Sequence, residues 1–336
     1  MTALSILDLV PVADGQEPSN ALANALDLAR FAETCGYKRY WVAEHHNMIG
    51  IASAATAVVL AYLGAGTNKI RLGAGGIMLP NHAPLVIAEQ FGTLESLFPK
   101  RIDLGIGRAP GTDQRTMQAL RRTLVSDEQF PQDVLELQHY FETPIHENAV
   151  KAVPGTGLKV PLYILGSSLY GAQLAAMLGL PYAFASHFAP DALMPALATY
   201  QQNFKPSEQL QTPYSMAGVN VVLADTDEEA QFLFTSIQQR FADMVRGRRG
   251  KLKPPIHNMD SYWNDMEKRQ AMQMLACSFV GSRKTVASAL RHFLSQTGVD
   301  ELIVTSAIYN HEARKNSYRL LAELDLGVHK PAKAFS

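Results

Sequence analysis

The sequence is short of cysteine, of an excess of either charge, and of long apolar runs. Only Cys35 and Cys277 occur among 336 residues, which excludes a disulfide framework or thiolate metal cluster and fits a reducing cytoplasm. The formal net charge is −1, so no broad field favours nucleic acid or an anionic membrane. No segment looks like a signal peptide or approaches the roughly 20 apolar residues that span a bilayer. We therefore expect a cytoplasmic protein that acts on a small molecule.

Low-complexity linkers and internal repeats are also missing, so nothing marks a domain boundary. Hydrophobic residues make up 47% of the chain and charged residues 18%, a composition that can bury a large core. We expect one domain over residues 1–336.

Short apolar runs alternate along the chain with stretches of helical spacing. Eight predicted strands lie at 3–10, 39–43, 70–79, 101–106, 161–166, 181–186, 214–223 and 301–306. Predicted helices include 19–36, 83–98, 126–141, 168–179, 226–246 and 283–297. Eight strand and helix units predict an α/β fold, a parallel (β/α)8 TIM barrel. An open doubly wound sheet is the alternative, but no G-x-G-x-x-G turn follows the first strand.

Two connections, 107–125 and 247–270, are longer than barrel loops need to be. They predict insertions after strands 4 and 7. The second combines a basic cluster with Pro254 and Pro255 and two aromatic residues. It is interpreted either as a solvated loop or as a mobile cover over the barrel mouth.

The second predicted strand ends in Glu44, His45 and His46, at the barrel end where functional side chains gather. Three interpretations are open. The residues bind a metal together with His82 and His187, or the histidines are structural, or one histidine is a general acid or base. Because strand side chains alternate, Glu44 and His46 should point one way and His45 the other.

The fifth predicted strand ends in Gly166, Ser167 and Ser168, which lead into a helix. Free N–H groups and hydroxyls at a helix start can hold a phosphate. Ser168 could equally be a plain N-cap. Arg108 follows another strand and could grip the same phosphate through two hydrogen bonds.

Gly75 and Gly76 lie together inside the third predicted strand. Paired glycines weaken a strand unless another group approaches closely. They allow either a flat aromatic ring to lie against the strand or a bulge that lets the barrel interior pack.

The order of these motifs is more specific than any one of them. Together W-V-A-E-H-H, G-A-G-G-I-M-L-P-N-H-A-P, R-I-D-L-G-I-G-R-A-P-G and L-G-S-S resemble the luciferase-like monooxygenase family. The resemblance implies a (β/α)8 barrel that takes reduced FMN from a separate NAD(P)H:flavin reductase and uses O2 to oxidise a small organic substrate. By this resemblance, the chain should be a flavin-dependent oxidoreductase.

Carried over by position, Glu44 matches a residue near the flavin, and His45 matches the acid/base histidine. The flavin-binding positions are Gly75 and Gly76, at a non-proline cis peptide, with Arg108, Gly166, Ser167, Ser168 and Gly171 around the phosphate. Gly107 departs from the luciferases, which have a reactive cysteine there. Light emission is therefore not expected. The resemblance does not imply a resident metal.

The resemblance leaves two other functions open. Related barrels bind a deazaflavin and transfer hydride without oxygen, and a flavin-binding protein without turnover has the same fold. Members of the family commonly dimerise, and the apolar segments 53–66 and 83–98 predict a homodimer surface. No nucleic-acid or membrane partner is expected.

Overall fold

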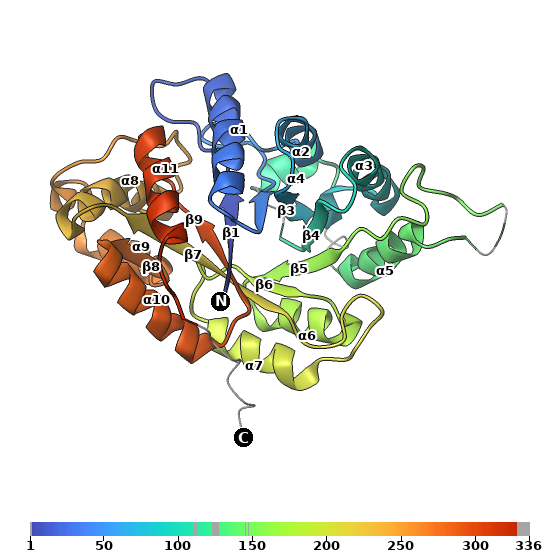
Figure 1. Cartoon of the computed structure of the whole chain (residues 1–336). Coiled ribbons are helices and arrows are strands. Elements are labelled where there is room, and N and C mark those ends of the chain that lie inside the picture. Colours follow the sequence, from blue (N-terminus) through green and yellow to red (C-terminus); the bar gives the residue numbers. More distant parts are fainter. Residues whose placement is uncertain (1, 110–112, 123–127, 145, 147, 328–336) are drawn as a thin grey trace.

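Eight parallel strands close into a barrel in this computed structural model, which describes residues 2–109, 113–122, 128–144, 146 and 148–327 (Figure 1). The barrel strands are β1 (Ala3–Asp8), β2 (Arg39–Val42), β3 (Arg71–Met78), β4 (Ile102–Gly107), β5 (Leu162–Gly166), β6 (Tyr182–Phe184), β7 (Ser215–Leu223) and β9 (Glu301–Thr305). Each pairs with the next, and β9 pairs with both β7 and β1. The predicted (β/α)8 barrel and its eight strands are confirmed.

Helices surround the strands (Figure 1). They are α1 (Pro18–Thr34), α2 (Thr56–Ala65), α3 (Pro84–Leu97), α4 (Gln114–Ala119), α5 (Phe130–Phe141), α6 (Leu169–Leu178), α7 (Leu193–Asn203), α8 (Asp227–Val245), α9 (Asp265–Met274), α10 (Arg283–Thr297) and α11 (His311–Ala322). Two 3₁₀ turns, η1 (Leu79–Asn81) and η3 (Met259–Ser261), interrupt the loops. In the described ranges, no helix is both long and apolar enough to cross a membrane.

Local sequence explains where these elements begin and end. All nine residues of β7 are buried, as expected for a strand covered on both faces. Helix α1 begins with Pro18 in its first turn and with a capping box between Glu17 and Asn20. Helix α6 ends at Gly179, which has a φ of 63°, a left-handed conformation that glycine adopts without steric cost.

A short ninth strand was not predicted. Strand β8 (Ser278–Gly281) pairs with residues 220–223 of β7, beyond the point where β6 ends. Its four residues are mostly half-buried, so they form no clear apolar run. The segment after β7 therefore contains α8, η3, α9, β8 and α10 before the barrel closes.

Both predicted insertions lie where expected. The connection 107–125 contains α4, although 110–112 and 123–127 lie outside the described residues. The start of the predicted helix 126–141 lies outside them too, and α5 is described from Phe130. The connection 247–270 contains η3 and the first turns of α9.

The amino-terminal end of the barrel is closed by buried charges. Arg39 Nη1 lies 2.7 Å from Asp103 Oδ2, and Arg39 Nε lies 2.8 Å from Glu301 Oε1. Arg71 reaches the other oxygen of Asp103 at 2.5 Å. These pairs join β2, β3, β4 and β9, and buried ions persist only when paired in this way. The opposite, carboxyl-terminal end is where the site residues gather.

Candidate active site

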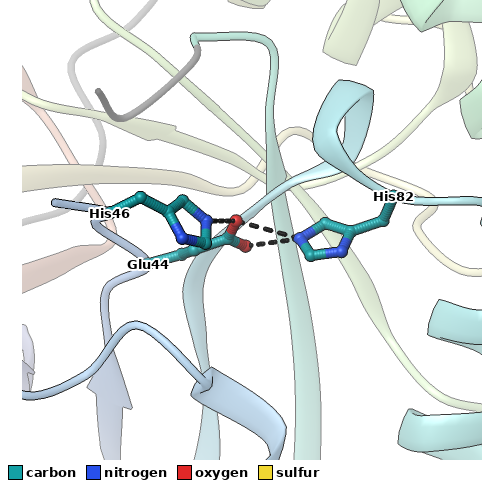
Figure 2. A group of neighbouring side chains, drawn as sticks. All are labelled: Glu44, His46 and His82. Atoms are coloured by element: carbon teal, nitrogen blue, oxygen red, sulfur yellow. Dashed lines mark hydrogen bonds and ion pairs between the residues drawn. The ribbon is translucent and has the colours of Figure 1, made fainter. Parts of the chain in front are cut away.

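Glu44, just after β2, lies between His46 and His82 (Figure 2). Its Oε1 lies 2.6 Å from His46 Nε2 and 2.9 Å from His82 Nε2. Its Oε2 accepts the Met78 N–H at 3.0 Å, and the Asn81 amide donates to Oε1 at 3.3 Å. Burial alone would raise the pKa of Glu44, but the bonds from His46, His82 and Met78 lower it to about 2. The carboxylate is therefore ionised at neutral pH.

This arrangement confirms that Glu44 and His46 point the same way. It is also a geometry in which a carboxylate and two imidazoles could hold a metal ion, since the three ligand atoms lie within 4.8 Å of one another. The hydrogen bonds of Met78 and Asn81 already occupy both carboxylate oxygens. Hydrogen bonding alone therefore accounts for the geometry of the cluster.

A chain of hydrogen bonds connects Glu44 to the loop after β4. Asn81, which donates to Glu44, accepts from Arg122 Nη1 at 3.1 Å. Arg122 Nη2 in turn donates to the backbone carbonyl of Arg108 at 2.9 Å. Glu44 thus helps to position the segment that carries the predicted phosphate-binding arginine.

One part of the predicted phosphate site can be followed in the structure, the contact between Arg108 and the start of α6. The Arg108 guanidinium lies 4.1 Å from the centre of the Tyr170 ring, in the first turn of α6. Ser168 is the N-cap of α6, but its side chain makes no capping bond. Ser167 and Ser168 are exposed, and among the described residues neither hydroxyl has a partner. Arg108 therefore lies beside the helix whose start carries these two hydroxyls, and a cation, hydroxyls and a helix start are the kinds of group that bind a phosphate.

Gly166 and Gly171 have a packing reason to be glycine. A Cβ on Gly171 would lie 3.3 Å from the Cα of Gly166, and one on Gly166 would lie 3.4 Å from the Cα of Gly171. A methyl group would make ordinary contact at Gly166 and a slightly tight contact at Gly171, so close packing favours glycine only modestly here. Their predicted cofactor contact stays a prediction.

The peptide between Gly75 and Gly76 is cis, as the family resemblance implied. The pairing register with β4 shifts between Gly75 and Ile77, so the bulge interpretation is correct. A Cβ on Gly75 would lie 2.7 Å from Leu7 Cδ1, and one on Gly76 would lie 2.8 Å from the carbonyl oxygen of Gly105. Barrel atoms therefore already explain both glycines, and a flavin ring beside them stays a prediction.

His45 has different neighbours from the residues that contact Glu44. Burial, followed by the charge of Arg240 in α8, lowers the pKa of His45 to about 4. Burial, His45 and Arg240 together lower the pKa of His187, just after β6, to about 3. Among the described residues, the buried Nδ1 atoms of both histidines have no hydrogen-bond partner. Both rings are thus neutral at pH 7 and have unused hydrogen-bonding capacity.

The segment after α8 reaches across the loops that follow β1 and β2. The Leu252 N–H donates to the Val12 carbonyl at 2.9 Å, and the Asp14 N–H donates to the Leu252 carbonyl at 2.7 Å. Arg249 lies 3.6 Å from Asp113, which belongs to the other insertion. Leu252 is therefore packed against the loop after β1 rather than solvated, whereas Arg249 and Gly250 are exposed, and a cover formed by 247–270 stays a prediction.

Two features of the site were not fully predicted. The sequence analysis grouped His82, 38 positions from Glu44, with the Glu44 cluster only as a possible metal ligand and not as a hydrogen-bond partner. Arg240 lies within an ordinary predicted helix, where a single arginine usually indicates a solvated face.

An all-parallel barrel with ionisable side chains and candidate phosphate-binding groups at one mouth is typical of a TIM-barrel enzyme. The family model described as "Luciferase-like monooxygenase" matches residues 2–301, so this chain belongs to the luciferase-like monooxygenase family and is an oxidoreductase. A luciferase-like monooxygenase of Escherichia coli K12 is 54% identical over 323 residues, which are 96% of each chain. The N-acetyl-S-alkylcysteine monooxygenase of Bacillus subtilis 168 is 31% identical and covers 98% of this chain and 99% of its own.

Solved structures agree with the family. The apo form of MsnO8 superposes with a TM-score of 0.85 at 33% identity, over 96% of this chain and 98% of its own. Two more distant structures share the fold alone. The oxygenating constituent of a Pseudomonas putida 3,6-diketocamphane monooxygenase, in complex with FMN, has a TM-score of 0.72 at 16% identity, with 96% and 97% coverage. An F420-dependent secondary alcohol dehydrogenase has a TM-score of 0.69 at 14%, with 96% and 99% coverage.

Proposed function

We propose that this chain is a flavin-dependent monooxygenase that takes reduced FMN from a NAD(P)H:flavin reductase and uses O2 to oxidise a small organic substrate. The observation that carries the proposal is the contact of Arg108 with Tyr170, in the first turn of the helix whose start carries the exposed Ser167 and Ser168. This cradle suits the phosphate of FMN. It lies at the same barrel mouth as His45.

Each residue has a separate part in this function. FMN, when bound, supplies the redox chemistry with O2. Arg108 and the two serines bind its phosphate, and Gly75 and Gly76 leave the strand surface free of side chains beside the ring. His45, neutral and with an unpartnered Nδ1, can hold or move a proton at that atom.

Glu44 is better suited to positioning than to proton transfer. Its pKa of about 2 and its four donors keep it ionised and occupied, whereas a general base works best with a pKa near the operating pH. We therefore assign it the role of holding η1 and, through Asn81 and Arg122, the Arg108 segment.

Deazaflavin-dependent hydride transfer is the second candidate, because the F420-dependent dehydrogenase shares the barrel. The phosphate cradle alone does not distinguish the two cofactors. Cofactor preference is therefore the first quantity to measure. A flavin-binding protein without turnover would bind FMN and yet consume no O2 beyond the free-flavin rate.

The experiment is an anaerobic titration of the purified chain with reduced FMN and, separately, with reduced F420. Arg108→Ala should weaken FMN binding by about tenfold or more, since a charged hydrogen bond contributes ~1.5–3 kcal/mol. Arg115→Ala, which removes an exposed arginine from the nearby α4, is the matched control and should leave binding unchanged.

Admitting O2 to the FMN complex then tests His45. The rate of flavin reoxidation should change in His45→Ala, while FMN affinity stays within about twofold. Tighter binding of F420 than of FMN would favour hydride transfer instead. Equal FMN affinity in wild type and Arg108→Ala would discard the cradle.

We also propose that the chain forms a homodimer through α2 and α3. The two helices lie side by side (Figure 1). Val58 and Tyr62 on α2 are 71% and 46% exposed, and Val86 and Leu97 on α3 are also exposed. Apolar side chains gathered on neighbouring helices are typical of an interaction surface.

A further inference from the structure

Glu44 differs from the other buried carboxylates of the described residues in the partners that it has. Five acidic side chains are buried there, and four of them lie within 2.8 Å of an arginine or lysine nitrogen: Asp8 with Arg314, Asp103 and Glu301 with Arg39, and Asp243 with Lys253. In the same part of the chain, Glu44 has no arginine or lysine partner. Its ion-pair contacts are with His46 and His82.

The two imidazoles do not replace a permanent cation. A buried carboxylate is costly unless a positive charge or hydrogen bonds compensate for its lost hydration. The four donors to Glu44 supply the hydrogen bonds. An imidazole supplies a positive charge only when both ring nitrogens carry protons. A cation from outside the chain could supply the charge that an arginine or lysine supplies to the other four carboxylates.

The three side chains present metal-ligand atoms at short range. The imidazoles lie on either side of the carboxylate (Figure 2), with His46 Nε2 at 2.6 Å and His82 Nε2 at 2.9 Å from Glu44 Oε1. Tetrahedral ligands at bond lengths of about 2.0–2.2 Å from Zn²⁺ lie roughly 3.4 Å apart. An ion can therefore replace the two Nε2 protons if the rings move outward by less than ~1 Å.

The surroundings of the cluster also suit an ion with three protein ligands. The Met78 N–H donates to Glu44 Oε2. Because each carboxylate oxygen has two lone pairs, this bond can persist and orient the carboxylate while Oε1 binds an ion. The side chains of His46 and His82 are 18% and 28% exposed, whereas that of Glu44 is 1% exposed. Water ligands can therefore reach the ion from the imidazole side.

We propose that Glu44, His46 and His82 form a binding site for a divalent transition-metal ion such as Zn²⁺, with water in the remaining position. Imidazole nitrogens favour Zn²⁺, Co²⁺, Ni²⁺ and Cu²⁺, whereas Mg²⁺ and Ca²⁺ prefer oxygen ligands. Binding releases the two Nε2 protons to solvent. Without the ion, the hydrogen bonds described above hold the same side chains together. The proposed oxidation contains no step that uses this site.

The test uses the purified chain without a histidine tag, freed of metal with a chelator and kept free of flavin. Co²⁺ is the probe, because its visible absorption intensifies when it enters a site of low coordination number with nitrogen ligands. We expect one equivalent of Co²⁺ to bind, Zn²⁺ to displace it, and an excess of Mg²⁺ to leave it in place. Zn²⁺ should also raise the melting temperature, since it binds the folded chain preferentially.

His46→Gln and His82→Gln each remove one ligand but keep an N–H donor for Glu44. Each should weaken Co²⁺ binding by about tenfold or more and remove most of the Zn²⁺-dependent rise in melting temperature. His311→Gln is the matched control, because His311 forms a second group of close ligand atoms with Asp27 and Glu312. That group is largely exposed, and the control should bind Co²⁺ as the wild type does.

A measurement on the wild type covers the case in which neither glutamine variant folds. Zn²⁺ should protect His46 and His82 from diethyl pyrocarbonate, located by mass spectrometry, while His139, which is 64% exposed, reacts equally with and without the ion. No binding of Co²⁺ or Zn²⁺ by the wild type would overturn the site. Binding that survives in both glutamine variants, binding that His311→Gln abolishes, or modification of His46 and His82 that Zn²⁺ does not slow would do the same.

Discussion

At the scale of single residues, Glu44 shows how a charge can be essential without reacting. Two imidazoles, a backbone N–H and an amide converge on its carboxylate. Glu44→Gln keeps the shape but replaces one acceptor oxygen with an NH2 group that faces donors. We expect the free energy of unfolding at pH 7 to fall by ~1–3 kcal/mol, measured by urea denaturation.

The pH dependence of that loss follows from the lowered pKa. The folded value is about 2 and the reference value is 4.5, so the ionised carboxylate stabilises the fold above about pH 4.5. The stabilisation is lost progressively as the pH falls towards 2. The difference between wild type and Glu44→Gln should therefore shrink over this range. A difference that stays constant from pH 7 to pH 3 would contradict this assignment.

The sequence predicted many of the site residues but fewer of the contacts that they make in the fold. Glu44, His45 and Arg108 could be found because each follows an apolar strand, where barrel enzymes place their chemistry. His82 was named with this cluster as a possible metal ligand, but its hydrogen bond to Glu44 could not be predicted because that contact depends on the path of η1. Arg240 gave no signal, because only the folded structure shows that its charge acts on His45.

At the scale of elements, the segment 249–252 depends on one glycine for its position. A Cβ on Gly50 would lie 2.1 Å from the carbonyl oxygen of Gly250. Gly50→Ala should therefore displace this segment while leaving the barrel intact. Trypsin cuts after arginine and lysine, and Arg248, Arg249 and Lys251 all lie in or beside the segment.

We expect Gly50→Ala to be cleaved there several-fold faster than wild type, because cleavage follows the population of the open form. Ile49→Ala, a change at an exposed neighbour, is the control and should be cleaved at the wild-type rate. Fragments can be located by mass spectrometry. Equal cleavage of all three proteins would mean that the backbone tolerates the methyl group by a small local shift.

Element boundaries were well predicted where burial is continuous. The predicted strand 214–223 differs from β7 by one residue at its start, and the predicted helix 283–297 coincides with α10. Strand β8 was missed because its pairing with the far end of β7 is a tertiary effect. The pattern of apolar residues thus specified the barrel, whereas the additions after β7 depend on contacts between distant segments.

At the scale of the whole molecule, the two ends of the barrel have different tasks. Paired charges close the amino-terminal end, where Arg39, Asp103 and Glu301 connect separate strands. The carboxyl-terminal end keeps Arg108 without a carboxylate partner among the described residues. The stabilising ion pairs and the proposed binding residues would therefore lie at opposite ends of the barrel.

The proposed dimer belongs to this scale as well, because α2 and α3 lie on the outside of the barrel. If these helices form the interface, light scattering after size exclusion should give twice the mass of one chain. Val58→Glu with Val86→Glu should shift the protein to the monomer, because association would bury two uncompensated charges. Met177→Glu, at an exposed position on α6, should leave the dimer intact. A monomeric wild type would show that no dimer forms, and a dimer that survives the double substitution would show that the interface lies elsewhere. If the double variant is monomeric as expected, its FMN titration will show whether the site depends on the partner.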